Sequence, residues 1–131
     1  MRSSVITMAL GTAGVVLLVA CGGSTSPYGG GGGGGGGGGC TPTATQLCMM
    51  NTAFNPATKT VSVGTTLTWM NGDPFGHTTT SNAANPVGCP TWNDPVSAGQ
   101  TSPGVTFGTA SVTCAYHCNI HATMQASVTV Q

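Results

Sequence analysis

Polar and apolar residues alternate with a period of two over several short stretches of the chain, mostly threonine and serine against valine, leucine and aromatic residues. Side chains of a β-strand point alternately to its two faces, so each stretch predicts a strand with one buried face. Turn residues recur about every eight to twelve positions, and no window has the period of an amphipathic helix. The clearest stretches are Thr60–Val63, Thr66–Trp69, His77–Thr80, Gly104–Phe107 and Ala110–Cys118. The pattern predicts an all-β sandwich or barrel.

Alternation within the last of these stretches sorts its side chains into two sets. One set is Val112, Cys114, Tyr116 and Cys118, and the other is Ser111, Thr113, Ala115 and His117. If Cys118 points into the protein, its neighbour His117 must point away from it. We therefore expect His117 to be a solvated surface histidine.

The first segment of the chain, residues 1–20, is typical of a cleaved signal peptide. Arg2 precedes an apolar run from Val5 to Val19, which is too short for a comfortable membrane span. The ending Leu18-Val19-Ala20-Cys21 resembles a lipobox, in which Cys21 becomes the lipid-bearing first residue of the mature protein. An ordinary secretory signal with a cysteine nearby is the alternative.

The second segment, residues 21–39, joins the predicted lipidated cysteine to a glycine-rich stretch with eleven consecutive glycines from Gly29. Such a stretch has no side chains to bury and predicts a flexible tether, with a mean reach on the order of 25 Å. Together the first two segments predict a periplasmic or cell-surface protein that is lipid-anchored to a bacterial membrane.

The third segment, residues 40–131, has the size of one domain. Its only ionised side chains are Lys59, Asp73 and Asp94, because Arg2 leaves with the signal peptide. Nothing is available to neutralise phosphate groups, so nucleic-acid binding is excluded. We expect the domain to be a monomer.

Candidate metal ligands lie close together near the C-terminus. Cys118, His121 and Met124 follow one another at C-x2-H-x2-M spacing, directly after a predicted strand. A soft thiolate and a thioether suit Cu(I), and imidazole suits both oxidation states, so the set favours a single copper ion. A second imidazole is available upstream, in His77.

Two motifs carry a resemblance to a known family. The segment W-x-N-x-D-x3-H over Trp69–His77, and Y-H-C-x2-H-x2-M over Tyr116–Met124, resemble the cupredoxins of the plastocyanin/azurin family. The short second motif is similar to that of amicyanin, and the resemblance covers roughly residues 47–131. It implies a Greek-key β-sandwich with a type 1 blue copper site. His77, Cys118 and His121 would be equatorial ligands, Met124 the long axial ligand, and Thr78 a brace for the loop.

The cysteine count adds constraints. If Cys21 carries lipid and Cys118 binds copper, then Cys40, Cys48, Cys89 and Cys114 remain. An even remainder in an exported protein predicts two disulfides, with three possible pairings. We favour the pairings Cys89–Cys114 and Cys40–Cys48. The first would fasten the long segment between residues 81 and 104 to a core strand. The other pairings stay open, and the amicyanin-like pattern has an aromatic residue in place of Cys114.

Three other kinds of metal site fit the sequence less well than a mononuclear copper site. Cys114-x3-Cys118-x2-His121-x2-Met124 is similar to the binuclear copper loop of cytochrome oxidase subunit II, but it lacks one residue before the histidine and an acidic residue between the cysteines. A haem attachment is excluded because C-x2-C-H is absent. Zinc binding by His117 and His121 would need a helix to bring the two rings together.

The sequence therefore predicts a single-electron carrier with one Cu(II)/Cu(I) ion, and not an enzyme, because four ligands leave no open position for a substrate. Its partners are expected to be redox proteins, which the sequence does not identify. The main alternative is a copper-binding protein for copper delivery or buffering, with the same ligands. A third is a purely structural disulfide domain.

Overall fold

The computed structural model describes residues 39–131, so the predicted signal peptide, Cys21 and most of the predicted tether lie outside the described residues. The described part is built from strands alone. They are β1 (Gln46–Met50), β2 (Ala53–Asn55), β3 (Thr58–Val61), β4 (Thr65–Asn71), β5 (His77–Ser81), β6 (Asn93–Val96), β7 (Val105–Phe107), β8 (Val112–His117) and β9 (Gln125–Val130). The all-β prediction is confirmed. In residues 39–131 no helix has the length and apolar character that a membrane span requires.

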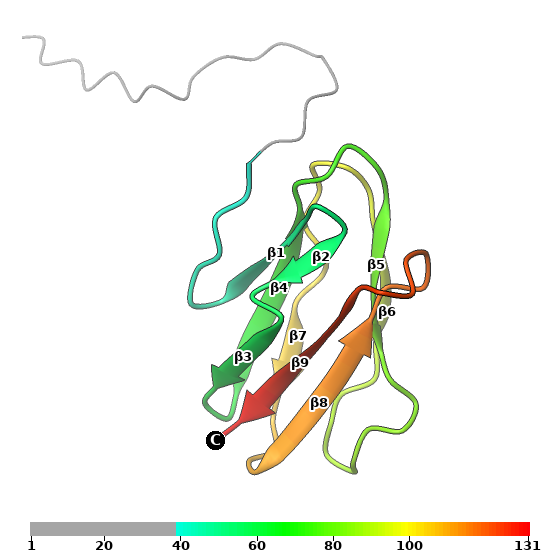
Figure 1. Cartoon of the computed structure of the whole chain (residues 1–131). Coiled ribbons are helices and arrows are strands. Elements are labelled where there is room, and N and C mark those ends of the chain that lie inside the picture. The colour runs from blue at the N-terminus through cyan, green and yellow to red at the C-terminus, as the bar shows by residue number, and fades with distance from the viewer. Residues whose placement is uncertain (1–38) are drawn as a thin grey trace, which may run out of the picture. The chain divides into compact units, whose positions relative to one another are not determined.

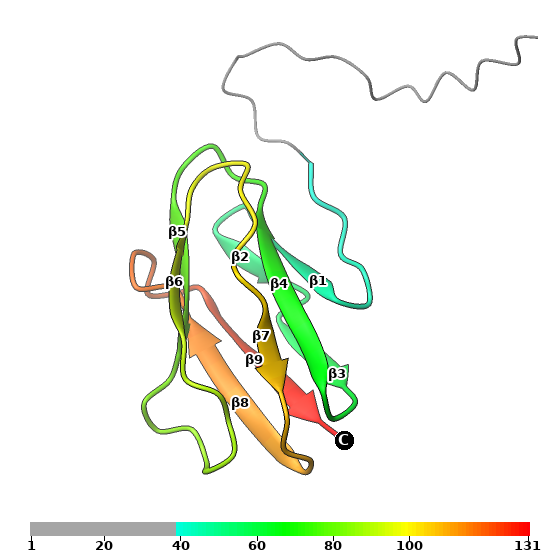
Figure 2. The same ribbon diagram turned by 180° about the vertical axis from the view of Figure 1, so that it is seen from behind.

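The strands form two facing sheets, as the front and back views show (Figure 1 and Figure 2). One sheet has the order β2-β1-β4-β7, and the other has the order β3-β9-β8-β5-β6. Both sheets are mixed, because β1 runs parallel to β4 and β3 runs parallel to β9, whereas the other neighbours are antiparallel. The predicted β-sandwich is therefore present.

Each alternating stretch of the sequence overlaps one strand, but four strands, β1, β2, β6 and β9, have no such stretch, and two of them show why. β1 is buried along its middle, with Leu47, Cys48 and Met49 all at 0% exposure, so its residues do not alternate. β6 contains Asp94 and Pro95, which are both unfavourable in a strand. Pro95 is tolerated because β6 is an edge strand that pairs only with β5.

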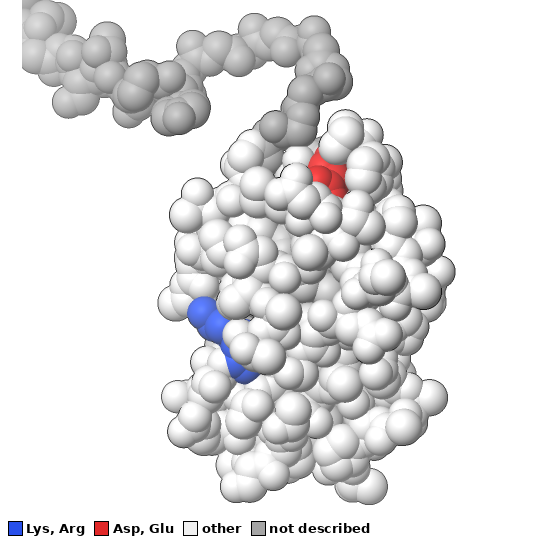
Figure 3. All heavy atoms as spheres, in the orientation of Figure 1, with Lys and Arg blue, Asp and Glu red and all other residues white. Residues whose placement is uncertain are grey.

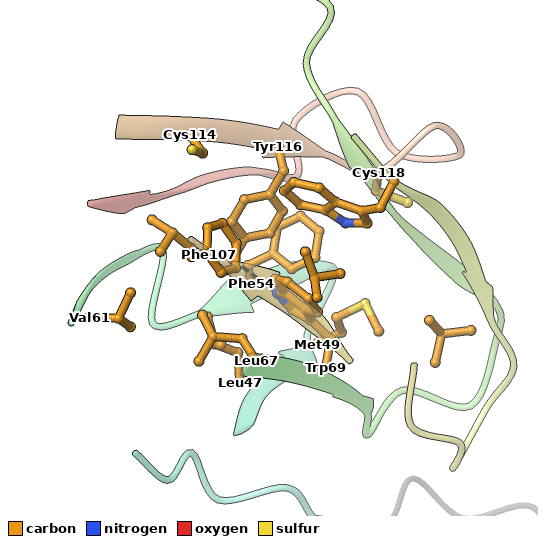
Figure 4. Packing of buried hydrophobic residues seen from close by; sticks show 14 of the residues in the cluster. Leu47, Met49, Phe54, Val61, Leu67, Trp69, Phe107, Cys114, Tyr116 and Cys118 are labelled. Atoms are coloured by element: carbon orange, nitrogen blue, oxygen red, sulfur yellow. Dashed lines mark hydrogen bonds between the residues drawn. The ribbon is translucent and has the colours of Figure 1, made fainter. Parts of the chain in front are cut away.

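Aromatic side chains fill the space between the sheets (Figure 4). Tyr116 points inward from β8 and packs edge-on against Phe54 and Trp69, with ring centroids 4.7 and 5.3 Å apart. Its hydroxyl accepts a hydrogen bond from Trp69 Nε1 at 3.1 Å. Trp92, which precedes β6, stacks on Trp69 at 5.8 Å and is a core residue. Phe107 completes the cluster, and both Trp69 and Phe107 are core residues.

Two disulfides fasten the ends of this core, and both favoured pairings are confirmed. Cys89–Cys114 joins the long segment after β5 to β8, with 5.6 Å between the Cα atoms. Cys40–Cys48 joins the start of the described chain to β1, with 5.7 Å between the Cα atoms. Within residues 39–131, Cys118 is the free cysteine, and it is buried.

Candidate metal centre

Two chain segments meet at one end of the sandwich. The β4–β5 connection (residues 72–76) leads into His77, the first residue of β5, and the β8–β9 loop (residues 118–124) begins with Cys118. β5 and β8 are antiparallel neighbours with Thr80 opposite His117, so the start of β5 lies beside the end of β8. Both His77 and Cys118 point inward, because each is an even number of positions from a buried residue of its strand.

Three ligand atoms converge where the segments meet. His77 Nδ1 and His121 Nδ1 are 3.1 Å apart, and Cys118 Sγ lies 3.8 Å from the former and 3.7 Å from the latter. An ion about 2.0 Å from two nitrogens and about 2.3 Å from a sulfur would separate these atoms by roughly 3.3–3.8 Å. The triangle therefore has the size that one ion requires, and the soft thiolate with two imidazoles suits copper.

The Cys118 sulfur is a preformed thiolate site. It is 1% exposed and accepts the backbone N–H of Thr78 at 3.3 Å. Burial raises the pKa of the Cys118 thiol, but the Thr78 N–H, the His77 ring, the Ile120 N–H and the His121 ring together outweigh burial and lower that pKa to about 6. The thiolate that binds metal is therefore the prevailing form near neutral pH.

His77 is buried, with 1% of its surface exposed, and both of its ring nitrogens are engaged. Nδ1 faces the other ligands, and Nε2 lies 2.9 Å from Asp73 Oδ2. Asp73 is itself only 7% exposed. Burial raises the pKa of its carboxyl, but the N–H of Thr52, His77 and the N–H of Asn51 together hold that pKa below its usual value. A carboxylate on the remote nitrogen fixes which ring nitrogen is free for the metal.

Asn71 gives the β4–β5 connection its shape. Its side chain is 0% exposed, and its Nδ2 donates to the carbonyls of Phe75 at 2.8 Å and Val96 at 3.0 Å. Its Oδ1 accepts the backbone N–H of Asp73 at 3.0 Å. This one amide folds the connection back on itself and thereby directs Asp73 toward His77.

The β8–β9 loop is closed by its own backbone and by β5. Cys118 N–H donates to the Met124 carbonyl at 3.0 Å, and Met124 N–H donates to the His121 carbonyl at 2.9 Å. Asn119 N–H donates to Thr78 Oγ1 at 2.8 Å, so the predicted brace at Thr78 is present. Met124 is buried in the core cluster with Cys118, and its role as axial ligand remains a prediction.

The second imidazole differs from the first in its exposure. His121 is half-buried, and no hydrogen bond within residues 39–131 involves its Nε2. Phe75, 44% exposed, packs against it with ring centroids 5.6 Å apart and also contacts His77 at 5.2 Å. Ile120, 59% exposed, is the adjacent residue. Apolar side chains therefore lie beside the outer edge of His121 and form its rim.

The rival ligand sets fail on geometry. Cys114 is in a disulfide with Cys89, so it offers no second thiolate for a binuclear centre. His117 points away from the site, as predicted, but it is half-buried and not freely solvated. Its two ring nitrogens meet the side-chain oxygens of Asn82 and Asn119, the latter at 3.0 Å. The expectation of a solvated His117 was therefore wrong, because Asn82 after β5 and Asn119 in the loop cover it.

Asp73 and Asn71 are the parts of the site that the sequence did not assign. Both belong to the W-x-N-x-D-x3-H motif, but Asp73 was treated only as one of the few charges of the domain. The signal was the four-residue interval from Asp73 to His77 in a chain that has almost no other acidic residue. A carboxylate so close in sequence to a candidate ligand can bond to the ligand's remote ring nitrogen, as Asp73 does with His77.

Charged side chains are sparse on the surface around this end of the protein (Figure 3). Lys59 belongs to β3 and donates to the Thr43 carbonyl at 3.1 Å, and Asp94 belongs to the edge strand β6. The face that presents His121 therefore offers apolar contacts and neutral polar groups.

No protein-family model matches the chain, and neither does any curated protein. Solved structures do match it. An amicyanin mutant in its oxidised state has a TM-score of 0.58 and 26% identity over 67% of this chain and 82% of its own. Another amicyanin mutant, in the reduced Cu(I) form at pH 4, has a TM-score of 0.59 and 26% identity over 70% and 86%. A purple cupredoxin from Nitrosopumilus maritimus has a TM-score of 0.56 and 23% identity over 66% and 99%. The chain is similar to these proteins in fold.

Proposed function

From the cupredoxin fold and its convergent ligands, we propose that the protein is a single-electron carrier with one type 1 copper ion. The main supporting observation is the triangle formed by His77 Nδ1, Cys118 Sγ and His121 Nδ1. The two nitrogens are 3.1 Å apart, and the sulfur lies 3.8 Å from His77 Nδ1 and 3.7 Å from His121 Nδ1. Copper in this site would supply the Cu(II)/Cu(I) couple. The neighbouring amicyanin structures, in oxidised and Cu(I) forms, support the same chemistry.

The chain's own residues suit electron transfer. His77 Nε2 is bonded to the Asp73 carboxylate, and Cys118 Sγ accepts the Thr78 N–H, so the ligand positions need little rearrangement when the charge of the site changes. Their burial excludes water. His121 brings its ring edge toward the surface and gives a short route for an electron.

Rigidity also favours electron transfer over copper delivery. A delivery protein must release its ion, which is easier from exposed and mobile ligands. Here the thiolate and the first imidazole are each 1% exposed, and the loop that carries Cys118 is bonded to β5. Loss of copper to a modest Cu(I) chelator during dialysis would contradict the carrier assignment and favour delivery or buffering.

Met124 is proposed as the weak axial ligand. Its burial beside Cys118 in the core cluster and the backbone bonds that close the loop support this role. Met124→Leu should keep copper and colour but raise the reduction potential, because loss of a weak donor disfavours Cu(II) more than Cu(I). An unchanged potential would point to another axial group.

The test of the whole proposal is spectroscopic. The copper-loaded domain should be intensely blue through charge transfer from the Cys118 thiolate, with the narrow copper hyperfine splitting of a type 1 centre. Cys118→Ser should abolish the colour and keep the β-sheet circular dichroism. An equally blue Cys118→Ser protein, or a wild type that takes up copper without colour, would overturn the assignment.

The proposed site of action is the outer face of a bacterial membrane, with Cys21 as the lipid anchor and residues 21–39 as the tether. Cys21→Ser should move the protein from the membrane fraction to the soluble exported fraction, because this one residue carries the anchor. A variant that stays in the membrane fraction would mean that the signal segment itself is retained as the anchor. The proposed partners are redox proteins that dock on the apolar rim of His121.

A further inference from the structure

The turn between β1 and β2 has an unusual backbone. Its two central residues, Asn51 and Thr52, both have positive φ, at 54° and 57°. Met50 and Ala53 pair across it, so the turn has the two-residue form in which both central residues are left-handed. Asparagine tolerates this region, but a β-branched threonine rarely occupies it. Strain at such a position points to a role for the local backbone.

That backbone conformation directs two N–H groups at one carboxylate. Asn51 N–H donates to Asp73 Oδ1 at 2.7 Å, and Thr52 N–H donates to Asp73 Oδ2 at 2.9 Å. Successive N–H groups in a turn form a concavity that suits an anion. Asp73 is 7% exposed, and in the described part of the chain its side-chain partner is His77 and not a lysine or arginine. The turn therefore offsets much of the cost of burying this charge.

The same carboxylate reaches the copper ligand. Oδ2 of Asp73, which accepts the Thr52 N–H, also lies 2.9 Å from His77 Nε2. Asp73 accepts bonds and donates none when it is ionised, so Nε2 carries the proton and Nδ1 presents its lone pair to the ligand triangle. A continuous line of contacts thus runs from the β1–β2 turn through Asp73 to His77.

We propose that Asp73, held by the Asn51-Thr52 turn, is a positioning residue that orients His77 and lowers the reduction potential of the site. This inference rests on the proposed copper function. A carboxylate on the remote nitrogen makes the imidazole a stronger donor. Stronger donation and nearby negative charge favour Cu(II), which carries one more positive charge than the Cu(I) produced when one electron enters. The isolation of Asp73 among so few charges makes its effect separable from any other.

The first experiment uses the only two acidic side chains of the sequence. Asp73→Asn keeps the size of the side chain and removes its charge, and Asp94→Asn removes the same charge from β6. We expect Asp73→Asn to lower the preference for Cu(II) over Cu(I) at least about tenfold. For one electron this corresponds to a rise in potential of about 59 mV. Asp94→Asn should leave the potential close to the wild-type value. Equal shifts in the two variants, or none in Asp73→Asn, would overturn the proposal.

A second readout reports orientation directly. In the Cu(I) protein, the His77 Nε2 proton should give a slowly exchanging NMR resonance, because it is buried and bonded to Asp73. Asp73→Ala should lose this resonance to fast exchange or shift it strongly, while the core aromatic resonances stay in place. An unchanged Nε2 resonance in that variant would mean that the carboxylate does not orient the ring.

The turn itself is tested by a double-mutant cycle. A glycine inserted between Asn51 and Thr52 should displace both N–H groups from Asp73. The effect of Asp73→Asn on the potential should then differ between the normal and the lengthened turn. An identical effect in both would remove the turn from the proposal.

A copper-loaded wild type that is not blue would overturn the proposed function as well. A blue protein whose reduction potential does not change with Asp73→Asn would overturn this inference alone.

Discussion

The β4–β5 connection and the β8–β9 loop each contribute one imidazole, but they hold it in opposite ways. His77 follows a connection folded around the buried amide of Asn71 and is bonded through Nε2 to Asp73. His121 lies in a loop with an exposed outer edge, and its Nε2 has no bond within residues 39–131. The two ligands face the same point with the same atom, Nδ1, at 3.1 Å from each other.

The difference teaches that one site needs both a fixed side and an open side. A redox centre is useful when its ligands stay in place as its charge changes, which requires buried and hydrogen-bonded groups. It must also exchange electrons with another protein, which requires one group at the surface. The β4–β5 connection provides the first property and the β8–β9 loop provides the second. Cys118 joins them, because its sulfur accepts N–H groups from Thr78 of β5 and from Ile120 of the loop.

The largest expected effect on the blue colour comes from removing each histidine side chain in turn. His121→Gly should open a gap at the surface, and added imidazole should fill it and restore the blue colour. His77→Gly should leave a gap that is closed to solvent, so added imidazole should not restore the colour. The measurement is the visible spectrum during titration with imidazole. Equal rescue of both variants would mean that the two sides do not differ in access.

A smaller effect is expected from removing the amide that shapes each segment. Asn71→Ala breaks three hydrogen bonds, two of them buried and one partly buried, and should reduce the free energy of unfolding by about 2–4 kcal/mol. Asn119→Ala removes exposed bonds from the β8–β9 loop and should cost less than about 1 kcal/mol. Chemical denaturation of both variants gives the two values. Similar losses would show that the two segments are equally structural.

The metal-free protein should reveal the thiolate through the pH dependence of its stability. Neighbouring donors outweigh burial and lower the Cys118 pKa to about 6 in the folded chain, whereas a thiol in the unfolded chain has a pKa of about 8.5. Between these values the unfolded chain binds more protons, so this contribution to stability rises with pH. It is complete above about pH 8.5 and is lost as the pH falls through about 6. Cys118→Ser should lack this rise in thermal unfolding scans, and parallel curves for the two proteins would contradict the shift.

The smallest expected effect concerns salt at the open side. Because charges are sparse, the electron self-exchange rate of the copper protein should change by less than about twofold between ~0.01 and ~0.5 M salt. Phe75→Ser should slow it by disturbing the apolar rim beside His121. Val63→Ser is the matched control, since Val63 is 49% exposed near the C-terminal end of β9, away from the site. NMR line broadening in mixtures of the two oxidation states measures the rate. A steep salt dependence, or equal slowing in both variants, would remove the apolar rim from the encounter.

Local signals account for most of what the sequence predicted correctly. Period-two alternation located β8 and its buried face, which includes Tyr116 and Cys118. The C-x2-H-x2-M spacing identified the β8–β9 loop, because ligands so close in sequence must lie close in space. β1 and β6 were missed for opposite reasons. β1 is buried on both faces and loses its alternation, and β6 owes its existence to pairing with β5 and not to its own residues.

By itself, the sequence determined the all-β class, the inward direction of Cys118 and three residues that converge as candidate copper ligands, and it favoured the two disulfides while other pairings stayed open. These follow from chemistry that neighbouring residues carry with them. Only the tertiary structure decided that Asp73 is buried against His77, that Asn51 and Thr52 hold it, and that Asn82 and Asn119 cover His117. The contacts of Asn51 and Thr52 with Asp73, and of Asn82 with His117, join residues 21 to 35 positions apart in the chain. Their physical cause is the packing of two sheets and the need to satisfy each buried charge and amide, which no local pattern of residues records.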